Sequence, residues 1–163
     1  MKAKVLIPVD TARNSLTAEE YALKLNWSMP LSVTLLNVLN TKRLEGHGIS
    51  PADQERIKSA MRKRAQDVLK KAAEPFDQAD IEYETRIEEG SPGEVICKIA
   101  ESEGFEMVII PQSGLSEWEE ILGGSVVRTV LNKCQVPVLL VKHSPEQLER
   151  QRKLRGKREL LPA

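Results

Sequence analysis

Apolar residues fall into five short segments along the chain, and each segment has the character of a β-strand. Four of them are almost wholly apolar, at residues 4–9, 32–39, 107–110 and 136–141. Such runs are typical of strands that helices cover on both faces of a sheet. Residues 81–87 alternate polar and apolar side chains, which predicts a strand with one less covered face. Pro137 has no amide donor and therefore belongs at the start of the last strand or on an edge.

Helical spacing of apolar residues fills the intervals between these strands. We predict helices over 14–28, over 51–73, from Ser91 to Gly104, and over a short segment that carries Val126, Val127, Val130 and Leu131. Ser91 with Glu94 three residues later predicts a capping box. The helix over 51–73 carries seven Lys and Arg between its apolar positions. We interpret them as a solvated face, with contact to an acidic partner as the alternative.

Strands and helices alternate along the domain, and this alternation sets the fold class. It predicts parallel strands joined by right-handed helical crossovers, in one open sheet with helices on both faces, an α/β architecture. A compositional break follows His143, because residues 144–163 hold six Lys or Arg, three Glu and few apolar positions. We therefore expect a domain over 1–143 and a charged C-terminal tail over 144–163.

The charge balance and the cysteines narrow the class of protein. Lys and Arg together number 24, as do Asp and Glu, so net charge gives no general attraction to nucleic acid or to an anionic membrane. No apolar run approaches the ~20 residues that span a bilayer, and the stretch that Asp10 interrupts is too short for a signal peptide. Cys97 and Cys134 lack CxxC spacing, and two thiols in a chain of this size indicate a reducing compartment, so we expect a cytoplasmic protein. Both cysteines fall on apolar helix faces, where we expect them to be buried.

Three strand ends carry the residues that a ligand would meet. In open parallel sheets, ligands bind beyond the carboxyl ends of the strands. Asp10 ends the first strand, Val38–Asn40 ends the second, and residues 111–114 follow the fourth, ahead of the Gly-Gly-Ser at 123–125. Glycines there allow close approach of a phosphate, and a helix N-terminus offers free amides. An adenine-nucleotide pocket, with Asp10 on a ribose hydroxyl or a metal ion, is one interpretation; plain helix caps are the other.

Motifs of the common nucleotide-binding and hydrolase families are absent from the sequence. It contains no GxGxxG, no GxxxxGK[ST] and no GxSxG. His47 and His143 have no His or Cys at ligand spacing, so we expect no metal centre. No general base or phosphate-binding lysine is evident. We therefore expect a protein that is not an enzyme, with slow ATP hydrolysis as the remaining alternative.

Three stretches, taken in order, resemble the universal stress protein family over roughly residues 2–142. They are the opening Val5–Asp10, the Glu89–Pro92 turn before a helix, and Gly124–Val127 followed by the strand Val136–Val141. The resemblance implies a Rossmann-like sheet of five strands in the order 3-2-1-4-5, similar to that of adenine nucleotide α-hydrolases. The ATP-binding branch of the family carries G-x2-G-x9-G-[ST]. Here Gly114, nine further residues and then Gly124-Ser125 match the second half of that motif.

Two features depart from the motif. Pro111 stands where the motif has its first glycine, so it has no N–H for a ribose or phosphate oxygen, and its ring fills space that glycine leaves open. Glu117, Glu119 and Glu120 lie in the nine-residue spacer, close to where the phosphates would run. These carboxylates would repel a triphosphate or recruit Mg²⁺ first, and repulsion is the simpler interpretation.

The resemblance implies ATP or another adenine nucleotide as ligand, with or without Mg²⁺, and a homodimer. It places the ligand on Pro8, Val9, Asp10, Val38, Pro111, Gly114, Gly124, Ser125 and Val126. Adenine and ribose would contact the first four of these, and the triphosphate would follow Gly114 and the segment 124–126. Family members often pair through the last strand, here Val136–Val141, and an apolar edge strand needs covering in any case.

Three functions remain compatible with the sequence. The first is a nucleotide-binding regulator of the stress response, in which the ligand biases the shape of the dimer and hence its partners. The second is a scaffold of the same fold that acts through protein contacts, with Pro111 and the glutamates closing the pocket. The third, an enzyme of the wider α-hydrolase-like class, is the weakest, because residues 10–13 lack the serine- and glycine-rich loop of such enzymes. We rank the first ahead of the second.

Overall fold

The protein is described by a computed structural model that covers residues 1–10, 16–112, 126–142, 146 and 149. Its elements are β1 (Ala3–Pro8), α1 (Leu16–Asn26), β2 (Leu31–Leu39), the 3₁₀ helix η1 (Thr41–Leu44), α2 (Pro51–Gln78), β3 (Tyr83–Glu89), α3 (Pro92–Ser102), β4 (Met107–Gln112), α5 (Val126–Lys133) and β5 (Val138–Lys142). The predicted alternation of strands and helices is confirmed. Within the described ranges, no helix is long and apolar enough to cross a membrane. The tail expected over 144–163 lies outside them apart from 146 and 149, so the domain division stays a prediction.

The strands form one parallel sheet in the order β3-β2-β1-β4-β5, which confirms the predicted fold class and strand order. β1 lies at the centre, where Val5 stands opposite Val33 of β2 and Met107 of β4. The chain builds outward from β1 to β3 and then crosses back to β4 and β5, so its direction of growth reverses between β1 and β4. We call the carboxyl ends of these two strands, residues 8–10 and 111–112, the switch point.

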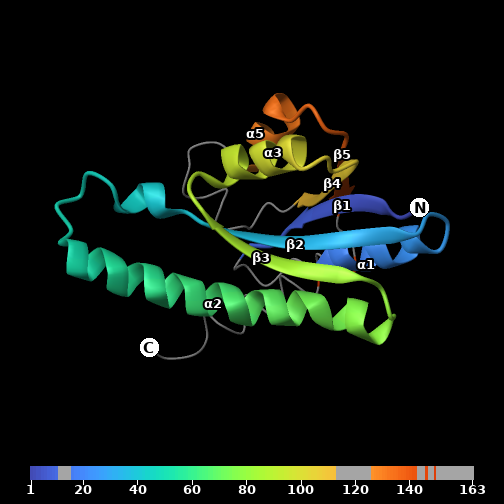
Figure 1. Cartoon of the computed structure of the whole chain (residues 1–163), viewed down its shortest axis with the longest axis horizontal. Helices are drawn as coiled ribbons and strands as arrows, with labels where there is room; N and C mark the ends of the chain where they lie inside the picture. Colours follow the sequence, from blue (N-terminus) through green and yellow to red (C-terminus); the bar gives the residue numbers. More distant parts are fainter. Residues whose placement is uncertain (11–15, 113–125, 143–145, 147–148, 150–163) are drawn as a thin grey trace.

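Helices cover both faces of the sheet, and each face has its own apolar core. In Figure 1, α3 and α5 lie on one side of the strands, whereas α1 and α2 lie on the other. Ile7 and Val9 belong to the core beneath α1 and α2, and Leu6 belongs to the core beneath α3 and α5. Successive side chains of a strand point to opposite faces. A strand covered on both sides therefore appears in the sequence as an unbroken apolar run.

The two edge strands are less covered than the central ones. Side chains of β3 are half-buried or exposed, as its alternating pattern predicted. Those of β5 are half-buried except for the exposed Lys142. Glu89, at the end of β3, forms ion pairs with Lys58 at 3.6 Å and Arg62 at 2.8 Å, both on α2. Part of the basic face of α2 is therefore used within the chain.

Helix α2 runs further than its apolar stripe predicted, to Gln78 rather than Ala73, with Pro75 inside it. A proline in a helix interior removes a backbone hydrogen bond at a cost of about 3 kcal/mol. The fully buried side chain of Phe76, just beyond the proline, offsets this cost by keeping the last turns packed on the core. The buried residues of α2 begin only at Ala65, and the first half of the helix projects beyond the sheet (Figure 1).

Two local predictions are wrong. Ser91 precedes α3 as expected, but its side chain makes no capping hydrogen bond; its backbone carbonyl accepts from the Val95 N–H at 2.9 Å. Pro92 at the start of the helix already has the required backbone geometry, so α3 begins without a side-chain cap. Cys134 lies one residue beyond α5 and is half-buried, rather than lying on the apolar face of that helix.

Candidate functional site

The pairing between β1 and β4 stops early, and this defines the local structure of the switch point. β1 remains paired with β2 as far as Pro8. With β4 it pairs at Val5 and Leu6, although β4 continues beside β5 to Gln112. The two central strands are therefore unpaired beyond Leu6. In open α/β sheets this is the position at which ligands bind.

Pro8 contributes to this early end from the β1 side. Backbone N–H groups along a parallel strand point alternately to its two neighbours. The Val9 N–H donates to the Leu36 carbonyl of β2 at 2.8 Å. The nitrogen of Pro8 therefore faces β4, and it has no hydrogen to donate. The next bond from β1 to β4 cannot form.

Pro111 has the same effect from the β4 side. The Val108 N–H donates to the Pro137 carbonyl on the β5 side at 2.9 Å. The nitrogen of Pro111, three residues on, therefore faces β1. It also lacks a hydrogen, so it cannot donate to the Pro8 carbonyl that the continued register would place opposite. Two prolines from separate strands thus end the ladder at the same place.

Four of the predicted ligand residues lie together on the β1 and β2 side of the switch point. Pro8, Val9 and Val38 are buried, and Asp10, which follows β1, is half-buried. Asn37, only 2% exposed, donates its side-chain amide to the Val9 carbonyl at 2.7 Å. This buried bond fixes the backbone that leads into Asp10. Sequence reasoning missed it, although an asparagine inside an apolar strand is a visible signal.

Two further predicted residues lie on the other side of the switch point. Pro111 is half-buried near the end of β4, and Val126 is 2% exposed at the first position of α5. The remaining predicted residues lie outside the described part of the chain; they are Gly114, Gly124 and Ser125, together with the cluster of Glu117, Glu119 and Glu120. The predicted phosphate end of the site therefore stays a prediction.

Three buried side-chain oxygens among the described residues have no hydrogen-bond partner. They are both carboxyl oxygens of Glu19 and Oδ1 of Asn40. Asn40 directly follows β2, and Glu19 lies in the first turn of α1, which follows β1. All three therefore lie toward the carboxyl ends of these strands. A buried polar atom without a partner points to a ligand, a water or a functional role.

Asn40 stands at the N-cap position of η1, yet its side chain does not cap that helix. An asparagine at this position usually accepts from a free amide of the first turn. Its oxygen is instead buried and unpartnered. Asn40 can therefore accept a hydrogen bond from a bound group that carries an N–H or O–H. The sequence marked the end of this strand but did not single out this side chain.

Burial, together with the negative charges of Asp10 and Glu20, raises the pKa of Glu19 to about 8. Its own backbone amide opposes this rise but does not reach hydrogen-bonding geometry with the carboxyl oxygens. The Glu19 carboxyl is therefore mostly protonated at neutral pH. In the sequence Glu19 stands next to a second glutamate, Glu20, so the pattern did not indicate a buried acid at this position.

A family model described as the universal stress protein family matches residues 1–142. Among curated proteins, the universal stress protein MJ0531 of Methanocaldococcus jannaschii is 28% identical over 141 residues, which cover 85% of this chain and 81% of that protein. The solved structure of protein MJ0577 from the same organism is 27% identical, with a TM-score of 0.70 over 88% of this chain and 98% of the other.

Two solved structures of similar fold contain an adenine nucleotide. One is a universal stress family protein of Arabidopsis thaliana with AMP bound, at a TM-score of 0.65 and 16% identity over 89% of this chain and 94% of the other. The second is a universal stress protein in complex with cAMP, at a TM-score of 0.60 and 17% identity over 88% of this chain and 98% of the other. At these identities the likeness establishes a shared fold.

Proposed function

Because the chain belongs to the universal stress protein family, we propose that it binds an adenine nucleotide at the switch point and acts as a regulatory protein rather than an enzyme. The early end of the β1–β4 ladder, caused by Pro8 and Pro111, is the observation that carries this proposal. It leaves backbone and side-chain acceptors next to a gap in the pairing at the position where α/β sheets bind nucleotides.

The chemistry of the described residues suits the base and ribose better than the phosphates. In this proposal the base packs next to Val9 and Val38, which are buried in the single chain, and Asp10 supplies a carboxylate for ribose hydroxyls. Asn40 Oδ1 is an acceptor without a partner, which suits the exocyclic amino group of adenine. In this proposal the phosphates, with or without Mg²⁺, follow Gly114, Gly124, Ser125 and Val126.

The homodimer belongs to the same proposal. β5 is an edge strand, and its four apolar side chains are only half-buried in the single chain. Pairing of β5 with β5 of a second copy would cover this edge. We also place the protein in the cytoplasm, where reducing conditions would keep Cys97 and Cys134 as thiols.

The test begins with the purified full-length chain. We expect denaturation to release an adenine nucleotide that anion-exchange chromatography identifies. We also expect the stripped protein to bind ATP, AMP or cAMP saturably in isothermal titration calorimetry, with GTP binding at least about tenfold more weakly because its base presents an oxygen instead of the amino group. No release, and no binding up to millimolar concentrations, would overturn the proposal in favour of a scaffold that acts through protein contacts.

A pair of substitutions at Pro111 tests the geometry of the switch point. Pro111→Gly adds an N–H that faces the ligand position and removes the ring, so we expect nucleotide binding to tighten by about 2–10-fold. Pro111→Ala adds the same N–H but keeps a side chain. Comparing the two variants therefore separates the effect of the new hydrogen-bond donor from the effect of the space that the proline ring leaves. Weaker binding in both variants would mean that the new amide pairs with the Pro8 carbonyl and extends the ladder instead.

A further inference from the structure

Helices α3 and α5 are in direct contact, far from one another in the sequence. A side-chain carbon added at Gly93 of α3 would lie 2.6 Å from Cγ2 of Thr129 on α5. Only glycine permits this approach, because any larger residue would overlap the threonine. The two helices are therefore held at short range, and residues one turn further along each helix lie close together as well.

Two polar contacts join the same helices further along. Nζ of Lys133 lies 3.8 Å from Oε1 of Glu94, and the Gln135 N–H donates to Oε1 of Glu101 at 2.9 Å. On α3 the two contacting glutamates flank Cys97 in the sequence, three residues before it and four residues after it. On the other segment the two contacting residues immediately flank Cys134. The contacts therefore bracket both cysteines of the chain.

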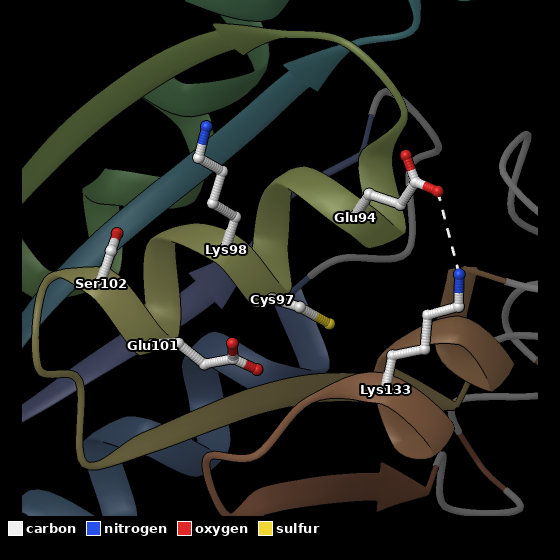
Figure 2. A pocket seen from close by; sticks show the side chains of 6 residues that line it. All are labelled: Glu94, Cys97, Lys98, Glu101, Ser102 and Lys133. Carbon is white, nitrogen blue, oxygen red and sulfur yellow. Dashed lines mark ion pairs between the residues drawn. The ribbon is translucent and has the colours of Figure 1, made fainter.

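The two cysteines consequently lie near one another across this contact. Cys97 is 6% exposed and belongs to the core beneath α3 and α5, and the half-buried Cys134 packs against that core. Figure 2 shows the sulfur of Cys97 directed away from its own helix toward the segment that carries Lys133. Cys134 packs against the same apolar cluster that contains Cys97, and its neighbours on both sides, Lys133 and Gln135, contact α3 one turn before and one turn after Cys97.

A solvent-facing hollow gives small molecules access to the Cys97 side of this contact. It has a volume of about 530 Å³ and is lined by Glu94, Cys97, Lys98, Glu101, Ser102 and Lys133. These side chains are shown in Figure 2, with the ion pair between Glu94 and Lys133 at one side of the hollow. Five of the six lining side chains end in a charged or polar group, and the hollow opens to solvent, so water and a small polar oxidant can enter it.

We propose that Cys97 and Cys134 form an oxidation site, at which a hydroperoxide such as hydrogen peroxide converts the two thiols into a disulfide between α3 and the end of α5. The Cys134 thiolate attacks one peroxide oxygen, the O–O bond breaks, and protonation of the leaving oxygen gives water and a sulfenic acid on Cys134. The Cys97 thiol then gives up its proton as its sulfur attacks that sulfenic sulfur, and the displaced hydroxide takes up a proton and leaves as a second water. Two thiols are oxidised by two electrons in all, and one peroxide is reduced.

The order of the two cysteines follows from their surroundings. Burial, together with the neighbouring Cys134 thiol, raises the pKa of Cys97 to about 12. Cys97 therefore remains a thiol, whereas the attack on peroxide requires a thiolate. Cys134 is more exposed and follows Lys133 directly, so it reacts first, and Cys97 resolves the sulfenic acid.

Peptide mapping of the full-length chain tests the proposal. The protein is treated with a small excess of hydrogen peroxide, alkylated without reduction and digested with trypsin. Cleavage after Arg86, Lys98, Lys133 and Lys142 places the cysteines in peptides 87–98 and 134–142. We expect these two peptides to be joined, with a loss of about 2 Da from the intact monomer that dithiothreitol reverses. We also expect the melting temperature to rise by on the order of 10 °C, because the bridge closes a long loop.

Single substitutions test the order of reaction. In Cys97→Ala, Cys134 should accumulate as a sulfenic acid that dimedone traps; in Cys134→Ala, Cys97 should remain alkylatable after the same treatment. Trapping mainly on Cys97 would overturn the assigned order. The wild-type protein alone tests the site itself. The site is overturned if its cysteines stay unmodified, if they become separate sulfinic acids without a link, or if a bridge forms only between two chains.

Discussion

Replacing Glu19 by glutamine removes a buried ionisable group while keeping nearly the same shape. The Glu19 side chain is fully buried in the first turn of α1, and neither carboxyl oxygen has a hydrogen-bond partner. Glutamine cannot ionise, so the difference between the two proteins isolates the cost of placing a charge at this position. That cost depends on pH, which makes the difference measurable without assuming its absolute size.

The magnitude follows from the pKa of the buried carboxyl. Burial raises it from 4.5 to about 8. Between these values the folded chain keeps a proton that the unfolded chain loses, so the free energy of unfolding falls as pH rises. The stabilisation is fully present below pH 4.5 and is lost progressively up to about pH 8. With about 1.36 kcal/mol for each unit of pKa, the loss between pH 5 and pH 7 is roughly 2.5 kcal/mol.

The assay is urea unfolding followed by far-ultraviolet circular dichroism at pH 5, 6 and 7. We expect Glu19→Gln to gain about 2.5 kcal/mol over the wild-type protein between pH 5 and pH 7, because it lacks the titrating group. Glu55→Gln is the control, since Glu55 is an exposed glutamate of α2 whose charge is not among the causes of the raised pKa of Glu19. Its difference from wild type should change by less than about 0.5 kcal/mol over the same range.

A constant difference between Glu19→Gln and the wild-type protein from pH 5 to pH 7 would refute this reasoning. It would mean that Glu19 is ionised in the folded chain and that its carboxylate has a partner or meets solvent. The same outcome would remove Glu19 from the unpartnered polar atoms near the switch point. It would leave the argument from Pro8 and Pro111 unchanged, because that argument rests on strand register.

Three further substitutions test other parts of the molecule. Asn40→Ala should weaken adenine-nucleotide binding by about 5–10-fold while changing the free energy of unfolding by less than about 0.5 kcal/mol, because its Oδ1 has no partner among the described residues; a large loss of stability in urea unfolding would contradict this. Gly93→Ala should destabilise the protein by roughly 1–3 kcal/mol, because its new carbon would overlap Thr129, and an unchanged melting temperature would show that the helices can separate at no cost. Leu140→Pro should convert the proposed dimer to a monomer in light scattering, because the register directs the Leu140 N–H to the open edge of β5; Leu140→Ala, which loses the side chain but keeps the N–H, should stay dimeric.

The sequence by itself determined the kinds of elements, their order and most of their extents. An apolar run marks a buried strand because both of its faces are covered, and helical spacing marks an amphipathic helix because one face is covered. Both signals are local, so they survive without knowledge of the fold. The alternation of the two then leads to a parallel sheet, whose carboxyl ends must hold Asp10, Val38 and Pro111.

Only the tertiary structure decided what individual residues do within that frame. The effect of Pro111 depends on strand register. Its nitrogen faces β1 rather than β5 because the N–H of Val108, three residues earlier, pairs with the β5 side. Glu19 resembles its exposed neighbour in the sequence, and its burial results from where α1 lies on the sheet. Cys97 and Cys134 lie against the same apolar cluster because α3 and α5 pack closely at Gly93. Each of these facts depends on contacts between segments distant in sequence, which periodicity and composition do not encode.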